Sequence, residues 1–189
     1  MNNPLRTFIA LELNSDFHKA IAQIQSDLKK LNLDMKWVKP EIAHLTLKFL
    51  GDVPEKKIEA VVGALKKSLI NFKPFAIELT HIGAFPRIEF PQVLWIGLGG
   101  EIQAIKSIVA VLENELGEIG FKKEKRDFEA HITIGRLRSK KNLSLLTNAL
   151  KNYFVPHSIK QAITHLTLFK STLTPQGPIY KSLIKIELR

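Results

Sequence analysis

Alternation of apolar and polar residues predicts β-strands in seven segments of the chain. In residues 6–13, for example, Ile9 and Leu11 share one face, as the two-residue period of a strand requires. Gly51 is expected to end the second strand, and a turn at residues 174–178, with two prolines and a glycine, to join the last two. The expected strands cover residues 6–13, 43–50, 75–82, 93–98, 128–137, 158–169 and 179–188.

Apolar residues spaced three and four positions apart predict four helices between these strands. Ser15 is expected to cap the first, in which Phe17, Ile21 and Ile24 lie on one face. The expected helices cover residues 16–32, 54–69, 101–116 and 143–150. Each has one apolar face, and we expect that face to cover a sheet.

The order of helices and strands repeats, and two strands with the pattern His-x-Thr-x lie 87 positions apart. We interpret this as a duplication on the scale of a domain, far longer than a solenoid repeat. Short connections favour antiparallel pairing. The expected fold class is α+β: one domain, residues 1–189, of two pseudo-symmetric lobes whose sheets face each other across a central cleft, with the helices outside.

Composition narrows the function classes. A hydrophobic fraction of 45% in 189 residues suffices for a buried core, and the absence of cysteine excludes disulfides, thiolate metal sites and cysteine nucleophiles. We see no membrane span or signal peptide, so we expect a cytoplasmic protein. The net charge of +10 favours an anionic partner such as nucleic acid, although the Lys- and Glu-rich surfaces of thermophile proteins are an alternative explanation.

The most specific chemical signal is the pair His44-Leu45-Thr46-Leu47 and His131-Ile132-Thr133-Ile134. Side chains two apart on a strand point to the same face, so each strand presents imidazole and hydroxyl together and buries its aliphatic residues. A third copy, His165-Leu166-Thr167-Leu168, means that the motif alone does not say which histidines act. A single copy is more often cross-strand packing than catalysis.

Further blocks of sequence resemble the two-histidine phosphoesterases, and among them the LigT-like RNA 2′,3′-cyclic phosphodiesterases. The segments 37–40 (WVKP) and 44–51 (HLTLKFLG) are similar to that family's first signature. The blocks that continue the resemblance, in the family's order, are 83–86 (GAFP), 93–97 (VLWIG), 131–137 (HITIGRL) and 171–177 (STLTPQG) with Tyr180. Ala130 departs from the proline common in the family, and His165 falls where the family keeps no catalytic histidine.

Opening a cyclic phosphate needs a base to activate water and an acid to protonate the leaving oxygen, and two imidazoles can divide that work without a metal or cofactor. The resemblance implies that His44 is the proton donor and His131 the proton acceptor, and that the product is a 2′-phosphate. Thr46 and Thr133 would stabilise the phosphate oxygens. The expected partner is therefore RNA, or a nucleotide, that ends in a 2′,3′-cyclic phosphate.

Four further residues are candidates for binding the substrate. Lys48 has the same strand parity as His44, whereas Arg136 is at an odd offset from His131 and would share its face only if the strand bulges. Phe8 and Phe169 could stack on a base, although core packing is an alternative for both. The basic run 122–141, with eight Lys or Arg against three acids, could guide an RNA backbone or form a solvated face.

Three alternatives stay open. A metal hydrolase would need Asp or Glu at even offsets from the two histidines, and the motifs lack them. A 2′-5′ RNA ligase would run the reverse reaction through the same transition state. A non-catalytic RNA-binding module would use the same basic cleft. We expect a monomer.

Overall fold

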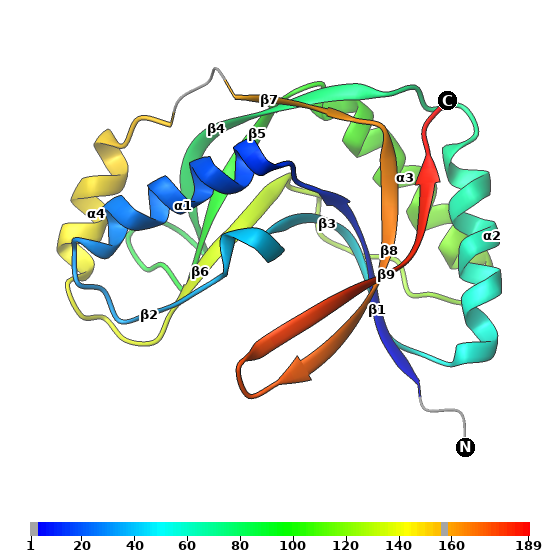
Figure 1. Cartoon of the computed structure of the whole chain (residues 1–189), viewed down its shortest axis with the longest axis horizontal. Coiled ribbons are helices and arrows are strands. Elements are labelled where there is room, and N and C mark those ends of the chain that lie inside the picture. Colours follow the sequence, from blue (N-terminus) through cyan, green and yellow to red (C-terminus); the bar gives the residue numbers. More distant parts are fainter. Residues whose placement is uncertain (1–3, 156–158) are drawn as a thin grey trace.

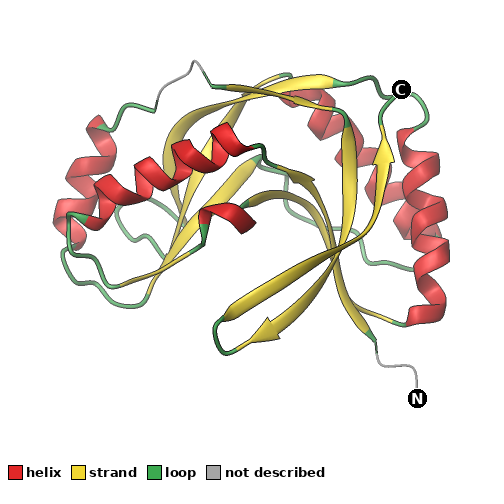
Figure 2. Cartoon of the chain, viewed as in Figure 1, coloured by secondary structure: helices red, strands yellow, loops and turns green. Residues whose placement is uncertain are grey.

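The computed structural model describes residues 4–155 and 159–189, which form two antiparallel sheets and four α-helices (Figures 1 and 2). The first sheet has the order β3-β1-β8-β9. Its strands are β1 (Leu5–Glu12), β3 (His44–Val53), β8 (His165–Thr174) and β9 (Gly177–Glu187). Within the described chain, no helix is long and apolar enough to cross a membrane.

The second sheet has the order β2-β6-β5-β4-β7. Its strands are β2 (Met35–Trp37), β4 (Phe75–Phe85), β5 (Val93–Gly100), β6 (His131–Leu137) and β7 (Lys160–Ile163). Apart from β2, its pairings correspond to those of the first sheet: His131 lies opposite Gly97 on β5, as His44 lies opposite Glu12 on β1. The expected α+β class with antiparallel sheets is confirmed; the division of one domain into two lobes stays a prediction.

The helices lie outside the sheets, as expected, in two pairs (Figure 1). The helices are α1 (Ser15–Lys29), α2 (Ile58–Leu69), α3 (Ile102–Glu118) and α4 (Leu143–Asn152). The helix α1 follows a strand of the first sheet but packs on the second, where the Gln25 side-chain amide donates to the carbonyl of Ile134, at 2.9 Å. The helix α3 follows a strand of the second sheet but lies against the first. This exchange ties the two sheets together.

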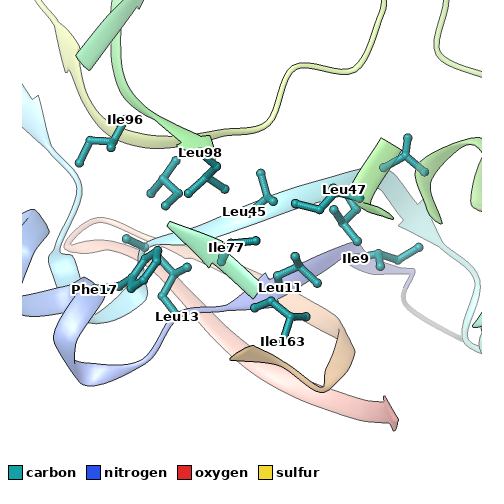
Figure 3. Packing of buried hydrophobic residues seen from close by; sticks show 14 of the residues in the cluster. Ile9, Leu11, Leu13, Phe17, Leu45, Leu47, Ile77, Ile96, Leu98 and Ile163 are labelled. Carbon is teal, nitrogen blue, oxygen red and sulfur yellow. The ribbon is translucent and has the colours of Figure 1, made fainter. Parts of the chain in front are cut away.

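Aliphatic side chains from both sheets belong to one core cluster (Figure 3). Ile9 and Leu45 of the first sheet and Ile77 and Ile96 of the second are fully buried in it. The alternation read from the sequence explains this placement, because Leu45 lies on the face opposite to His44. Burial of these aliphatic faces leaves the polar faces of β3 and β6 for a cleft.

Several expected element boundaries are wrong. The first helix is capped by Asn14, not Ser15: the Asn14 side chain accepts from the Phe17 backbone N–H at 2.9 Å. Gly51 does not end the second strand. It adopts a positive φ of 73°, which glycine tolerates without steric cost, and β3 continues to Val53. The strand expected at 128–137 begins only at His131.

The strand expected at 158–169 is two strands in different sheets. Residue 158 lies outside the described residues, and the rest divides at Thr164 into β7, which pairs with β4, and β8, which pairs with β1. One alternating run thus crosses from one sheet to the other. Alternation records which face is buried, and it does not record a change of partner strand.

Candidate active site

His44 and His131 are brought together from the two sheets. Their strands, β3 and β6, are in contact although they belong to different sheets. Both histidines line one cleft of about 840 Å³, together with Thr46 and Thr133. The strand that carries each histidine also presents its threonine to the cleft, as the two-residue period predicts.

Each histidine ring is held by the backbone just before it. His44 Nδ1 donates to the carbonyl of Ile42 at 2.9 Å, and His131 Nδ1 donates to the carbonyl of Glu129 at 2.7 Å. A carbonyl oxygen only accepts, so in both neutral rings the proton is on Nδ1 and Nε2 carries the lone pair. The cleft therefore holds two histidines whose Nε2 atoms are free to exchange a proton.

The two rings have different surroundings. His44 stacks on Phe8 with ring centroids 4.8 Å apart and meets the edge of Tyr180 at 5.1 Å. His131 lies at right angles to Phe85 at 4.9 Å. Burial lowers the pKa of His44 below its ordinary value of 6.5, and the hydrogen bond to Ile42 offsets this in part. The neutral form of His44 is thus favoured in the free protein.

An anion in the cleft should reverse that preference. We expect the Cε1–H resonance of His44, followed by NMR, to titrate with a midpoint below 6.5 in the free protein. Saturating inorganic phosphate should move the midpoint upward, because a negative charge beside Nε2 favours the imidazolium. A midpoint above 6.5 without phosphate, or one that phosphate does not move, would contradict this account of the His44 environment.

Bulges in the two histidine strands decide which residues beyond the motif reach the cleft. On β6, Thr133 pairs with Trp95 and Gly135 with Leu94, so Ile134 is the additional residue. On β3, Thr46 pairs with Ala10 and Lys48 with Ile9, so Leu47 is the additional residue. Each bulge reverses the alternation of side chains beyond it.

The reversal brings Arg136 and Phe49 to the cleft. The sequence placed Arg136 on the face of His131 only if its strand bulges, and β6 does bulge at Ile134. Phe49 occupies the corresponding position on β3, five residues after His44, and its ring is 51% exposed. The guanidinium of Arg6 lies over that ring, 4.5 Å from its centroid.

The same reversal removes Lys48 from the cleft, so the expectation that it binds substrate is wrong. Lys48 is buried on the opposite face, where Nζ donates to both carboxylate oxygens of Glu113 on α3, at 2.7 and 2.6 Å, and to the carbonyl of Lys122 at 3.0 Å. Its role is structural, because it joins β3 to the helix that covers the first sheet.

Replacing Lys48 with methionine should destabilise the protein. The side chains of Lys48 and Glu113 are only 7% and 16% exposed, so the variant leaves a buried carboxylate without its partner, at a cost of about 3 kcal/mol in the free energy of unfolding. Denaturant unfolding measures this. The matched control is Lys67→Met: Lys67 pairs with Glu115 of the same helix at 2.8 Å but is 69% exposed, so water screens the pair and the loss should be much smaller. Equal losses would contradict the assignment.

Phe8 and Phe169 support His44 and are not free to stack on a base. Phe8 is 3% exposed, and its ring contacts His44, Phe169 at 5.2 Å and Tyr180 at 5.0 Å. Phe169 does not line the cleft, and Phe8 lines it with only this small exposed fraction. The expectation that these two rings stack on a terminal base is therefore replaced by the alternative of packing behind the catalytic candidate.

Sequence reasoning missed several cationic residues of the cleft. Among the described residues, Arg136 is joined in the cleft lining by three further cationic side chains, Arg6, Lys36 and Lys39, and no carboxylate lines the cleft. The charges of Arg136 and Arg6 both oppose the upward shift that burial gives the pKa of Tyr180, so they converge on this part of the cleft. Of the basic run 122–141, only Arg136 lines the cleft. In the described residues, no group of three His, Cys, Asp or Glu side chains is placed to hold a metal ion.

The third motif lies outside the cleft. His165 is on β8, and its Nε2 lies 2.9 Å from a carboxylate oxygen of Glu12, which Lys185 also contacts at 2.5 Å. Thr167 is fully buried. The geometry thus separates His165 from the pair His44 and His131, as the context of the motifs predicts.

Comparison with protein families matches the model of the LigT-like phosphoesterases twice, over residues 11–95 and 96–180. Curated relatives named RNA 2′,3′-cyclic phosphodiesterase include a protein of Methanothermobacter thermautotrophicus, 32% identical over 93% of this chain and 95% of the relative. Others are from Aeropyrum pernix, 35% identical over 88% and 94%, and Thermotoga maritima, 34% identical over 97% and 95%.

Solved structures share the fold. A Thermus thermophilus protein superposes with a TM-score of 0.77 at 26% identity, and apo Escherichia coli LigT with 0.81 at 23% identity; each comparison covers 98% of both chains. Another structure of E. coli LigT holds 3′-AMP. With the family model matched over both halves and relatives above 30% identity along nearly the whole length, the chain belongs to the LigT-like family of two-histidine phosphoesterases.

Proposed function

We propose that this protein hydrolyses the terminal 2′,3′-cyclic phosphate of RNA to a 2′-phosphomonoester. The observation that carries the proposal is the pair of histidines whose Nδ1 atoms are fixed by backbone carbonyls and whose Nε2 atoms share one cleft lined by cations. The names of the curated relatives support the same reaction. A cyclic phosphate is an anion, which suits this cleft.

In the proposed step, His131 Nε2 accepts a proton from water while the water oxygen attacks phosphorus. The bond from phosphorus to O3′ breaks, and His44 Nε2 donates a proton to the departing O3′. The 2′ ester remains, so the product is a 2′-phosphate. Exchange of protons with solvent returns both rings to their starting states, and no redox partner or metal takes part.

Three further side chains are proposed to stabilise the five-coordinate phosphorus. The hydroxyls of Thr46 and Thr133 line the cleft and make no hydrogen bond to any described group, so they are available as donors to the non-bridging oxygens. The guanidinium of Arg136 can bind two of those oxygens at once. Donors aimed at charge that develops in the transition state commonly contribute more to catalysis than any other single effect.

The ring of Phe49 is proposed to receive the terminal base. It lines the cleft, it is 51% exposed, and Arg6 covers part of it at 4.5 Å. A base stacked on an aromatic face gains attraction without being read by sequence. This replaces the stacking role expected of Phe8 and Phe169.

The direct test uses an RNA oligonucleotide that ends in a 2′,3′-cyclic phosphate, with the protein kept in excess EDTA. We expect conversion to a 2′-phosphomonoester, identified by chromatography against 2′- and 3′-phosphate standards, and no change in the same RNA ending in a 3′-phosphate. No conversion would overturn the proposal. Activity that is lost in EDTA and restored by a metal would favour the metal hydrolase.

Ligation is the second candidate, because the reverse reaction passes through the same transition state. Adding an RNA with a 5′-hydroxyl end tests it. We expect hydrolysis without a joined product, since water is far more concentrated than the competing hydroxyl. The monomeric state and the cytoplasmic location stay predictions.

A further inference from the structure

The cleft holds more positive charge than one cyclic phosphate requires. A cyclic phosphodiester carries one negative charge, and Arg136 suffices to neutralise it. Arg6 is engaged with the ring of Phe49. Lys36 and Lys39, both exposed, line the cleft without an ion pair to any described residue. These two lysines are therefore not explained by the reacting phosphate.

Lys36 is placed beside Arg136 by the strand pairing. The short strand β2 pairs with β6 so that Lys36 lies directly opposite Arg136. Residues directly opposite on antiparallel strands share a face, with Cβ atoms about 4.5–5.5 Å apart. Like charges in this position destabilise a sheet. Two unneutralised cations side by side, with no carboxylate in the lining, indicate a site that is completed by more than one anionic group.

RNA supplies a second anion close to the first. Each nucleotide adds one phosphate, so the group nearest to a terminal cyclic phosphate along the chain is the 5′-phosphate of the same nucleotide. Lys36 and Arg136 both have long, flexible side chains, so from their paired positions they can reach two neighbouring phosphates. Lys39, which precedes the short 3-10 helix Pro40–Ile42 leading to His44, adds a further positive charge to the cleft lining.

We infer that Lys36, assisted by Lys39, binds the 5′-phosphate of the terminal nucleotide, next to the reacting phosphate on Arg136. This inference rests on the proposed function and adds to it. The cleft then distinguishes the end of an RNA chain, in which the terminal nucleotide always carries a 5′-phosphate, from a free nucleoside 2′,3′-cyclic phosphate, which has none.

The test measures binding of two product-like ligands by calorimetry at low salt: adenosine 2′-monophosphate and adenosine 2′,5′-bisphosphate. In the unsubstituted protein, the 5′-phosphate should tighten binding about tenfold, the gain typical of a charge-assisted hydrogen bond. Lys36→Met, which keeps an apolar stem and removes the charge, should lose most of that gain, and Lys36→Arg should keep it. The control Lys106→Met removes the same charge from an exposed position on α3, outside the cleft lining, and should keep the gain as well.

Equal affinities for the two ligands, or a gain that persists in Lys36→Met, would overturn the inference. Because this readout needs no turnover, it is separate from the proposed function, which the RNA assay decides. A kinetic arm compares adenosine 2′,3′-cyclic phosphate with and without a 5′-phosphate. We expect Lys36→Met to lower the ratio of the two kcat/KM values about tenfold. If both values fell equally, Lys36 would act at the reacting phosphate, and the inference would be wrong.

Discussion

Replacing His44 or His131 with alanine should lower kcat/KM on RNA with a terminal cyclic phosphate by about 10²- to 10⁴-fold, the usual contribution of a positioned acid or base. Each variant removes one Nε2 from the cleft and leaves the other without the group that completes proton transfer. The double variant should be little slower than either single one, because the two rings act as a unit. Single-turnover kinetics with saturating enzyme separate this loss from weaker binding.

The control for the histidines is His165→Ala. His165 carries the same His-x-Thr pattern but bonds to Glu12, outside the cleft. The His165→Ala variant should keep most of the activity of the unsubstituted protein. Thermal unfolding should show that all three variants are folded. Substantial activity in His44→Ala or His131→Ala, or a loss in His165→Ala as large as theirs, would contradict the assignment of the pair.

Arg136→Ala should lower kcat/KM by about 10²- to 10³-fold, as does the removal of one donor to a developing oxyanion. The bulge at Ile134 turns Arg136 into the cleft. Its guanidinium therefore lies on the same strand, β6, as His131. Arg136→Lys should recover only part of the loss, because an ammonium keeps the charge and lacks the planar fork that binds two oxygens.

The matched control for Arg136 is Arg138→Ala. Arg138 is exposed two residues further along the chain and does not line the cleft. The Arg138→Ala variant should change kcat/KM less than threefold, which corresponds to about 0.65 kcal/mol in transition-state stabilisation. If Arg136→Ala and Arg138→Ala had equal effects, Arg136 would contribute only long-range attraction, and its contact with the phosphate oxygens would be disproved.

The alternation along β3 and β6 allowed the sequence to predict which face holds His44 and Thr46 and which face is buried. It did not predict the residues after the motifs. A bulge changes the parity of everything beyond it, so Lys48, which has the parity of His44, points into the core, and Arg136, which does not match His131, points into the cleft. A bulge depends on the partner strand, which a local pattern does not contain.

Residues from distant elements were the hardest part of the site to predict. Arg6 and Lys36 reach the cleft because β1 pairs with β3 and β2 with β6, and three-residue β2 is too short for alternation to identify it as a strand. Phe8 looked like a stacking surface because aromatic rings suit both a core and a base. Because Phe8 is only 3% exposed, its ring packs in the core and is not available to a base.

The division of labour between the histidines can be measured most directly with a substrate whose leaving atom is changed. In a nucleoside 2′,3′-cyclic phosphorothiolate with sulfur in place of O3′, the leaving thiolate needs no proton. We predict that His44→Ala recovers most of its lost rate on this substrate, measured relative to the unsubstituted protein, and that His131→Ala does not. Recovery by His131→Ala, or by neither variant, would contradict the assignment of His44 as the proton donor and His131 as the acceptor.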